Sequence, residues 1–78
     1  MRIIGEKNLP NGLKATIFSW NGKFLIKFEN GAFEQTYKVS ETDIAGLADI
    51  HQWIDNPGFQ EKIQAVFLQM EENLDGIW

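Results

Sequence analysis

His51 is the one histidine of the chain and the residue best suited to acid–base chemistry. Asp55 follows it at a four-residue step, so on a helix this carboxylate could orient the imidazole as a general base. Such a pair needs a nucleophile within reach, but the sequence has no cysteine, and Ser19 is expected to be a small packing residue on the core face of a sheet. We therefore predict that the protein is not an enzyme and has no catalytic residues. His51 is expected at the edge of the core or on an acidic helix surface.

The acidic residues do not follow a known metal-binding pattern. Glu71, Glu72 and Asp75 lack the loop spacing and the glycine of a calcium loop. A Cys/His zinc site is excluded because the chain has one histidine and no cysteine. No catalytic or phosphate-binding motif is present either. We expect no metal and no cofactor.

Aromatic and lysine side chains in the first half of the chain could instead support binding. Phe18, Trp20 and Leu25 are expected to cluster on one face of a sheet, and a grouped, exposed apolar patch usually marks an interaction site. Trp20 is the candidate anchor because tryptophan is enriched among interface hot spots. Lysines on the same face surround this cluster. The candidate partner-binding residues are Phe18, Trp20, Leu25, Lys14, Lys23, Lys27 and Lys38.

Two Asn-Gly pairs, Asn21-Gly22 and Asn30-Gly31, predict the sheet that positions these side chains. Each pair lies between runs rich in β-branched and aromatic residues, and both residue types tolerate the positive φ of a two-residue type I′ turn. With two-residue loops, paired residue numbers sum to 43 in the first hairpin and to 61 in the second. The register of three strands follows from this arithmetic.

This register assigns side chains to two faces of the sheet. On the core face it places Ile17 opposite Ile26, Ala15 opposite Phe28, Phe28 opposite Phe33, and Phe24 opposite Tyr37. On the outer face it places Lys14 opposite Glu29, Lys27 opposite Glu34, Leu25 opposite Phe18 and Thr36, and Trp20 opposite Lys23. Opposite charges meet twice on the outer face, as a stable register favours.

Helical patterns follow the strands. Ser40 or Thr42 is a candidate N-cap for a helix that carries Ile44 to Ile54 and ends near Asp55. Asn56-Pro57 then predicts the start of a second helix, with proline at its first position. Apolar residues at three- and four-residue steps from Phe59 to Leu74 extend that helix, and Gly76 is its expected end, followed by an apolar tail of Ile77 and Trp78.

The sequence thus predicts an α+β fold, a three- to four-stranded antiparallel β-meander with two C-terminal helices packed on one face. Arg2 to Lys7 supplies the fourth strand, and Leu9 to Gly12 supplies the turn after it. At 78 residues the chain allows a single domain, residues 1–78, with the meander in 1–39 and the helices in 40–78. No apolar run approaches the ~20 residues that cross a bilayer, and we expect a cytoplasmic protein without membrane contact.

Charge is unevenly placed along the chain. Residues 1–39 hold six basic and three acidic residues, a net charge of +3. Residues 40–78 hold one basic and eight acidic residues, a net charge of −7. The strand half is therefore basic and the helix half acidic.

Two classes of function fit these features. The first is a protein-interaction module that binds a second copy of the chain or another protein through the outer face. The alternative is single-stranded nucleic acid, with bases stacked on Trp20 and Phe18 and phosphates neutralised by lysines. Pairing of Glu29 and Glu34 with lysines on the same face favours the first. A structural subunit, a toxin or phage accessory and a small-molecule binder remain further alternatives, and the sequence leaves open whether the C-terminal tail covers this face.

Overall fold

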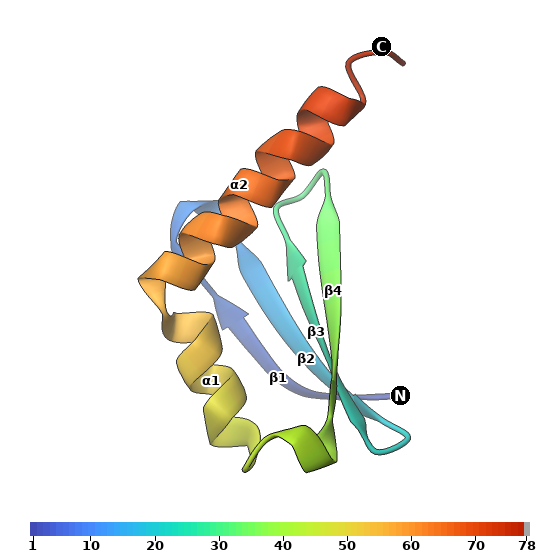
Figure 1. Ribbon diagram of the computed structural model, residues 1–78, viewed down its shortest axis with the longest axis vertical. Coiled ribbons are helices and arrows are strands. Elements are labelled where there is room, and N and C mark those ends of the chain that lie inside the picture. Colours follow the sequence, from blue (N-terminus) through green and yellow to red (C-terminus); the bar gives the residue numbers. More distant parts are fainter. Residues whose placement is uncertain (78) are drawn as a thin grey trace.

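A four-stranded antiparallel sheet followed by two helices forms the computed structural model, which describes residues 1–77. The expected α+β fold class is confirmed, including the fourth strand. The strands run in the order β1-β2-β3-β4, and both helices pack against the same face of the sheet (Figure 1). The elements are β1 (Arg2–Asn8), η1 (Pro10–Gly12), β2 (Lys14–Trp20), β3 (Lys23–Glu29), β4 (Glu34–Ser40), η2 (Glu41–Asp43), α1 (Leu47–Asp55) and α2 (Pro57–Asn73).

The hairpin of β2 and β3 has the predicted two-residue turn and register. Asn21 and Gly22 both have positive φ, 50° and 72°, as a type I′ turn requires. Paired residues sum to 43 along the whole ladder, with Ile17 opposite Ile26. The turn residues and the alternation of side chains therefore agree on one register.

The predicted register of β3 and β4 is wrong by two residues. Paired residue numbers sum to 63, because the loop spans four residues, Asn30 to Phe33. The Asn30 side-chain oxygen accepts hydrogen bonds from the amides of Ala32 (3.2 Å) and Phe33 (2.9 Å). The Asn30 amide also donates to the Phe33 carbonyl (3.2 Å). The asparagine side chain thus stabilises a longer turn than the two-residue turn that Asn-Gly usually favours.

A shift of two residues keeps every side chain on its predicted face, because side chains alternate with a period of two. What changes is the partner across the ladder. The predicted oppositions of Phe28 with Phe33, Phe24 with Tyr37, Lys27 with Glu34, and Leu25 with Thr36 are corrected. The observed oppositions are Phe28 with Gln35, Ile26 with Tyr37, Phe24 with Val39, Leu25 with Lys38, Lys27 with Thr36, and Glu29 with Glu34.

β1 joins the sheet beside β2 with one irregularity. Its register shifts between Ile3 and Gly5, which leaves Ile4 as an extra residue in a β-bulge. The chain then turns through η1, where Asn11 and Gly12 have φ values of 65° and 75°. The Leu9 amide donates to the Leu13 carbonyl (2.7 Å) and closes this turn.

The first helix starts later than predicted. Ser40 caps the short helix η2 by accepting a hydrogen bond from the Thr42 amide, and α1 begins only at Leu47. Asp49 accepts a hydrogen bond from the Ala45 amide (2.8 Å) and stabilises the start of α1. α1 ends at Asp55 as predicted.

The boundary between the two helices confirms the prediction from Asn56-Pro57. The Asn56 side chain accepts hydrogen bonds from the amides of Gly58 (2.8 Å) and Phe59 (3.3 Å) at the start of α2. The Gln60 side chain donates to the Ile54 carbonyl (2.8 Å) and satisfies the end of α1. α2 ends at Asn73, three residues before Gly76, the expected end.

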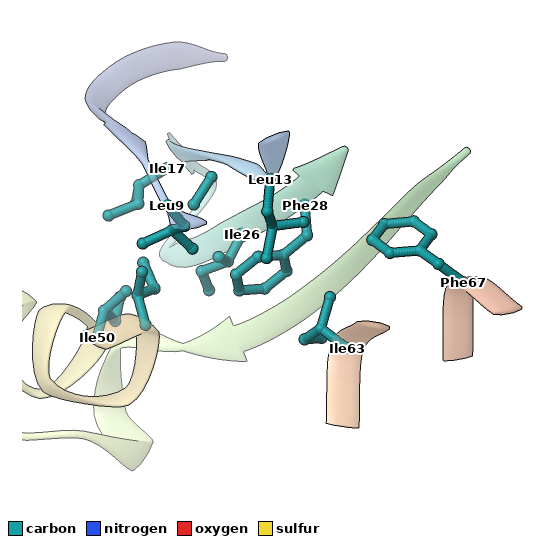
Figure 2. Packing of buried hydrophobic residues seen from close by; sticks show 10 residues of the cluster. Leu9, Leu13, Ile17, Ile26, Phe28, Ile50, Ile63 and Phe67 are labelled. Atoms are coloured by element: carbon teal, nitrogen blue, oxygen red, sulfur yellow. The ribbon is translucent and has the colours of Figure 1, made fainter. Parts of the chain in front are cut away.

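The hydrophobic core lies between the sheet and the two helices. In Figure 2, Ile63 and Phe67 of α2 and Ile50 of α1 point toward the strand residues Ile26 and Phe28. The buried cluster contains Leu9, Leu13, Ala15, Ile17, Ile26, Phe28, Ile50, Ile54, Ile63 and Phe67.

Four aromatic rings extend this core toward β4. Phe28 contacts Tyr37, Trp53 and Phe59 edge to face, with ring centroids 5.5–5.9 Å apart. Trp53 of α1 stacks on Phe59 of α2 at 4.0 Å. Aromatic pairs in these geometries add to the free energy of burial, so this cluster joins the sheet to both helices.

Candidate functional site

The face of the sheet that points away from the helices, here called the outer face, carries all seven candidate binding residues. Residues directly opposite in a ladder share a face, so the three registers define rows across the strands. One row contains Ile3, Phe18, Leu25 and Lys38, and the row beside it contains Trp20, Lys23 and Ser40. The remaining rows are Glu6, Thr16, Lys27 and Thr36, and Asn8, Lys14, Glu29 and Glu34.

The apolar residues of this face form one patch that contains both buried and exposed side chains. Leu25 is only 6% exposed although no helix covers it, and it lies between Phe18 and Lys38 in its row. Trp20 is 44% exposed and Ile3 is 55% exposed. Phe18 lies between Ile3 and Leu25 in one row, two residues before Trp20 on β2, and is half-buried. The patch therefore offers exposed apolar surface on β1 and at the end of β2, beside a buried residue on β3.

Ile3 belongs to this patch and was not among the residues expected from the sequence. The bulge at Ile4 changes the phase of alternation within β1, so a uniform period of two misplaces the first residues of the strand. The pairing of Ile3 with Phe18 places it on the outer face. A run of Ile3, Ile4 and Gly5 is the signal that could have suggested a bulge.

The charges of the outer face nearly cancel. Lys27 forms an ion pair with Glu34 (3.8 Å), diagonally across the ladder, and its amine lies 5.7 Å from the centre of the Phe18 ring. Lys14 lies directly opposite Glu29. Four lysines and three glutamates on this face leave a net charge of +1. Lys38 is exposed next to Leu25 in its row, and Lys23 is exposed opposite Trp20.

The acid–base pair that His51 and Asp55 could form on a helix is not present in residues 1–77. Asp55 makes an ion pair with Lys7 of β1 instead, and Asp49 accepts a hydrogen bond from the Ala45 amide. His51 is half-buried in α1. Ser19 lies opposite Phe24 on the core face, as predicted. The described residues contain no group of three or more histidine and acidic side chains close enough to bind a metal ion.

Two open grooves lie away from the outer face. One, of about 430 Å³, lies between η1 and α2 and is lined by residues that include Pro10, Glu61 and Leu68. The other, of about 240 Å³, lies between β4 and α1 and is lined by residues that include Asp49 and Trp53. Each has one ionisable side chain, so neither brings an acid and a base together.

Comparisons with protein families, with curated proteins and with solved structures found no match for this chain. Within residues 1–77 no helix combines the length and the apolar character needed to cross a membrane. Ile77 is exposed, and Trp78, the other residue of the expected apolar tail, lies outside the described part of the chain.

Proposed function

We propose that this chain is a non-catalytic interaction module that binds another protein through the outer face of its sheet. The observation that carries the proposal is the row of Ile3, Phe18 and Leu25 with Trp20 beside it. Two of these side chains remain exposed on the side of the sheet that the helices leave open. Contiguous apolar patches of this kind mark interaction surfaces more often than scattered residues do.

Trp20 and Ile3 supply most of the apolar area that a partner could bury. Leu25 on β3 is already buried, so it gains little on binding. Tryptophan has a large rigid ring and only two rotatable side-chain bonds, so it needs little ordering when a partner binds. Trp20 is accordingly the expected hot spot.

The charges around the patch suggest the chemistry of the partner. Lys23 and Lys38 are exposed in the rows of Trp20 and Leu25, whereas Lys27 forms an ion pair with Glu34. A protein surface that is apolar at its centre and carries carboxylates at its rim would complement this arrangement. Such rim charges act mainly on the association rate.

Single-stranded nucleic acid is supported less well. A net charge of +1 over the whole face gives weak attraction for a phosphate backbone, whose binding depends on several neutralised charges. Glu34 and Glu29 also lie beside the lysines that would bind phosphate. This alternative therefore serves as an outcome of the test.

Site-specific photo-cross-linking tests the proposal. A photoreactive phenylalanine analogue replaces Trp20 on the outer face or Leu68 on the outer surface of α2, which is 62% exposed and serves as the matched control. Expression is kept at the natural level in the cells of origin. We expect position 20, and not position 68, to cross-link one defined protein.

Other results would overturn the proposal. A cross-link to nucleic acid would support the alternative, and a cross-link between two copies of the chain would assign the outer face to self-association. Equal cross-linking from positions 20 and 68, or none from position 20, would remove the outer face as a specific interface.

A further inference from the structure

β4 is the sheet edge whose pairing is regular along its whole length. β1 and β4 occupy the two edges. A bulge between Ile3 and Gly5 interrupts β1, and bulges are a common means of blunting an edge. β4 pairs with β3 from Glu34 to Ser40 without a shift, and it contains no proline. In Figure 1 no element of the described chain runs along the side of β4 that points away from β3.

Hydrogen bonds at the two ends of the β3–β4 ladder determine which way the main-chain groups of β4 point. The Asn30 amide donates to the Phe33 carbonyl (3.2 Å), and the Glu41 amide donates to the Gly22 carbonyl (3.0 Å). Both pairs follow the register in which residue numbers sum to 63. Hydrogen-bonded and non-hydrogen-bonded pairs alternate along an antiparallel ladder. The amides and carbonyls of the odd-numbered residues of β4 therefore point toward β3. The residues whose main-chain groups point outward are Glu34, Thr36, Lys38 and Ser40.

The exposed side chains of this edge are complementary to themselves in one alignment. Glu34 and Lys38 lie two residues on either side of Thr36, on the outer face, and all three are exposed. When two β4 strands meet antiparallel with Thr36 opposite Thr36, Glu34 of each strand lies opposite Lys38 of the other. We propose that β4 pairs with β4 of a second copy in this register, which joins two sheets into one continuous antiparallel sheet.

The hydrogen-bonding phase of the edge allows this register. Thr36 would pair with Thr36, and Glu34 with Lys38, and each of these residues presents its amide and carbonyl outward. Each such pair exchanges two main-chain hydrogen bonds. The proposed register therefore satisfies groups for which the sheet of one copy offers no partner strand.

Charge selects this register over its neighbours. A shift of two residues in either direction places Thr36 opposite Glu34 or Lys38 and breaks both ion pairs. Glu34 also lies directly opposite Glu29 within its own sheet, where like charges repel and the ion pair with Lys27 offsets only part of the repulsion. A lysine from a second copy on its other side would offset that repulsion. The same two charged residues discourage pairing with unrelated strands, which is how natural edges avoid aggregation.

The core face of the joined strands is compatible with the same alignment. Phe33 of one copy would lie opposite Val39 of the other, and both side chains are apolar and half-buried. The two-fold symmetry is the commonest geometry of homodimers. This dimer uses the edge of the sheet and is independent of the partner proposed for the outer face.

Charge-reversal variants test the dimer by sedimentation velocity over a range of concentrations. Glu34→Lys places lysines opposite Lys38, and Lys38→Glu places carboxylates opposite Glu34, so each variant alone should dimerise at least about tenfold more weakly than the wild type. A mixture of the two single variants restores both ion pairs and should dimerise like the wild type. The double variant, Glu34→Lys with Lys38→Glu, should do the same. Glu6→Lys on β1 is the matched control and should leave the dimer unchanged.

Thr36→Pro is a second, independent test because it removes an outward amide at the centre of the edge. Proline is tolerated on an edge strand where the main-chain nitrogen points to solvent. Circular dichroism checks that the variant folds. We expect this variant to be monomeric, and Trp20→Ala to remain dimeric. A wild type that stays monomeric up to about 1 mM would refute the dimer. So would single charge variants that dimerise as well as their mixture, or a dimer that survives Thr36→Pro.

Discussion

The side-chain amide of Gln35 in β4 donates a hydrogen bond of 3.0 Å to the main-chain carbonyl of Ile63 in α2. Gln35 is buried, and its side-chain oxygen accepts a hydrogen bond from the Tyr37 hydroxyl (2.8 Å). A glutamine on the core face is thus satisfied at both ends of its amide. This polar link fixes where α2 crosses the strand at the edge of the sheet.

Replacement of Gln35 by leucine is expected to destabilise the protein by about 1–3 kcal/mol, because the Tyr37 hydroxyl loses its acceptor. Urea denaturation measures the change. Tyr37→Phe is the matched partner in a double-mutant cycle, since it removes the hydroxyl that donates a hydrogen bond to Gln35. The two changes should cost less together than the sum of the single changes. Fully additive effects would show that the hydrogen bond contributes no coupling.

Phe28 is the centre of the aromatic cluster, and Phe28→Ala is expected to cost about 3–5 kcal/mol. Its side chain is fully buried and contacts three other rings. A domain of this size has a total stability of only about 3–5 kcal/mol, so the variant should be largely unfolded at room temperature by circular dichroism. Phe18→Ala, on the outer face, is the control and should remain folded. A folded Phe28→Ala variant with a similar urea midpoint would contradict the described core.

Asn56→Ala should destabilise the protein by about 1 kcal/mol, since it removes the side chain that caps α2. Asn56→Ser retains a hydroxyl acceptor at the cap and should recover most of the loss. Thermal denaturation of the three proteins in parallel checks this order. Equal melting temperatures for the alanine and serine variants would exclude a capping role.

The ion pair of Lys7 and Asp55 links β1 to the end of α1 at a partly exposed position. Surface pairs of this kind contribute about 0–1 kcal/mol and are screened by salt. A double-mutant cycle with Lys7→Met and Asp55→Asn should give a coupling in this range that decreases in about 1 M salt. A coupling that is unaffected by salt would argue against an electrostatic link.

The sequence predicted most of the fold because its local signals were consistent with one another. The two-residue turn needs positive φ at both positions, which Asn21 and Gly22 adopt. The alternation of side chains on either side of the turn fits only one register of β2 and β3. Asn30-Gly31 carries the same signal, but the Asn30 side chain binds two amides of the loop and lengthens it. The order of residue types along the chain does not show whether the Asn30 side chain will bind these amides.

The sequence predicted on which face of the sheet each candidate residue lies, but it did not predict how exposed each side chain is. An even shift of register left Leu25 and Lys38 on the outer face, although their expected partners changed. Periodicity could not show that Leu25 would be buried, nor that the bulge in β1 would add Ile3 to the patch. Both facts depend on packing between strands rather than on the order of residues within one strand.

The most direct test of the outer face is the affinity of the partner that position 20 cross-links, titrated against purified wild type, Trp20→Ala and Leu68→Ala. Both side chains are exposed, so the free energy of unfolding of each variant should lie within about 1 kcal/mol of the wild-type value. If Trp20 is the hot spot, Trp20→Ala should weaken binding by about 2 kcal/mol or more, roughly 30-fold in Kd. Leu68→Ala should bind like the wild type. Equal affinities for wild type and Trp20→Ala, or equal losses in the two variants, would contradict the outer face as the protein-binding surface.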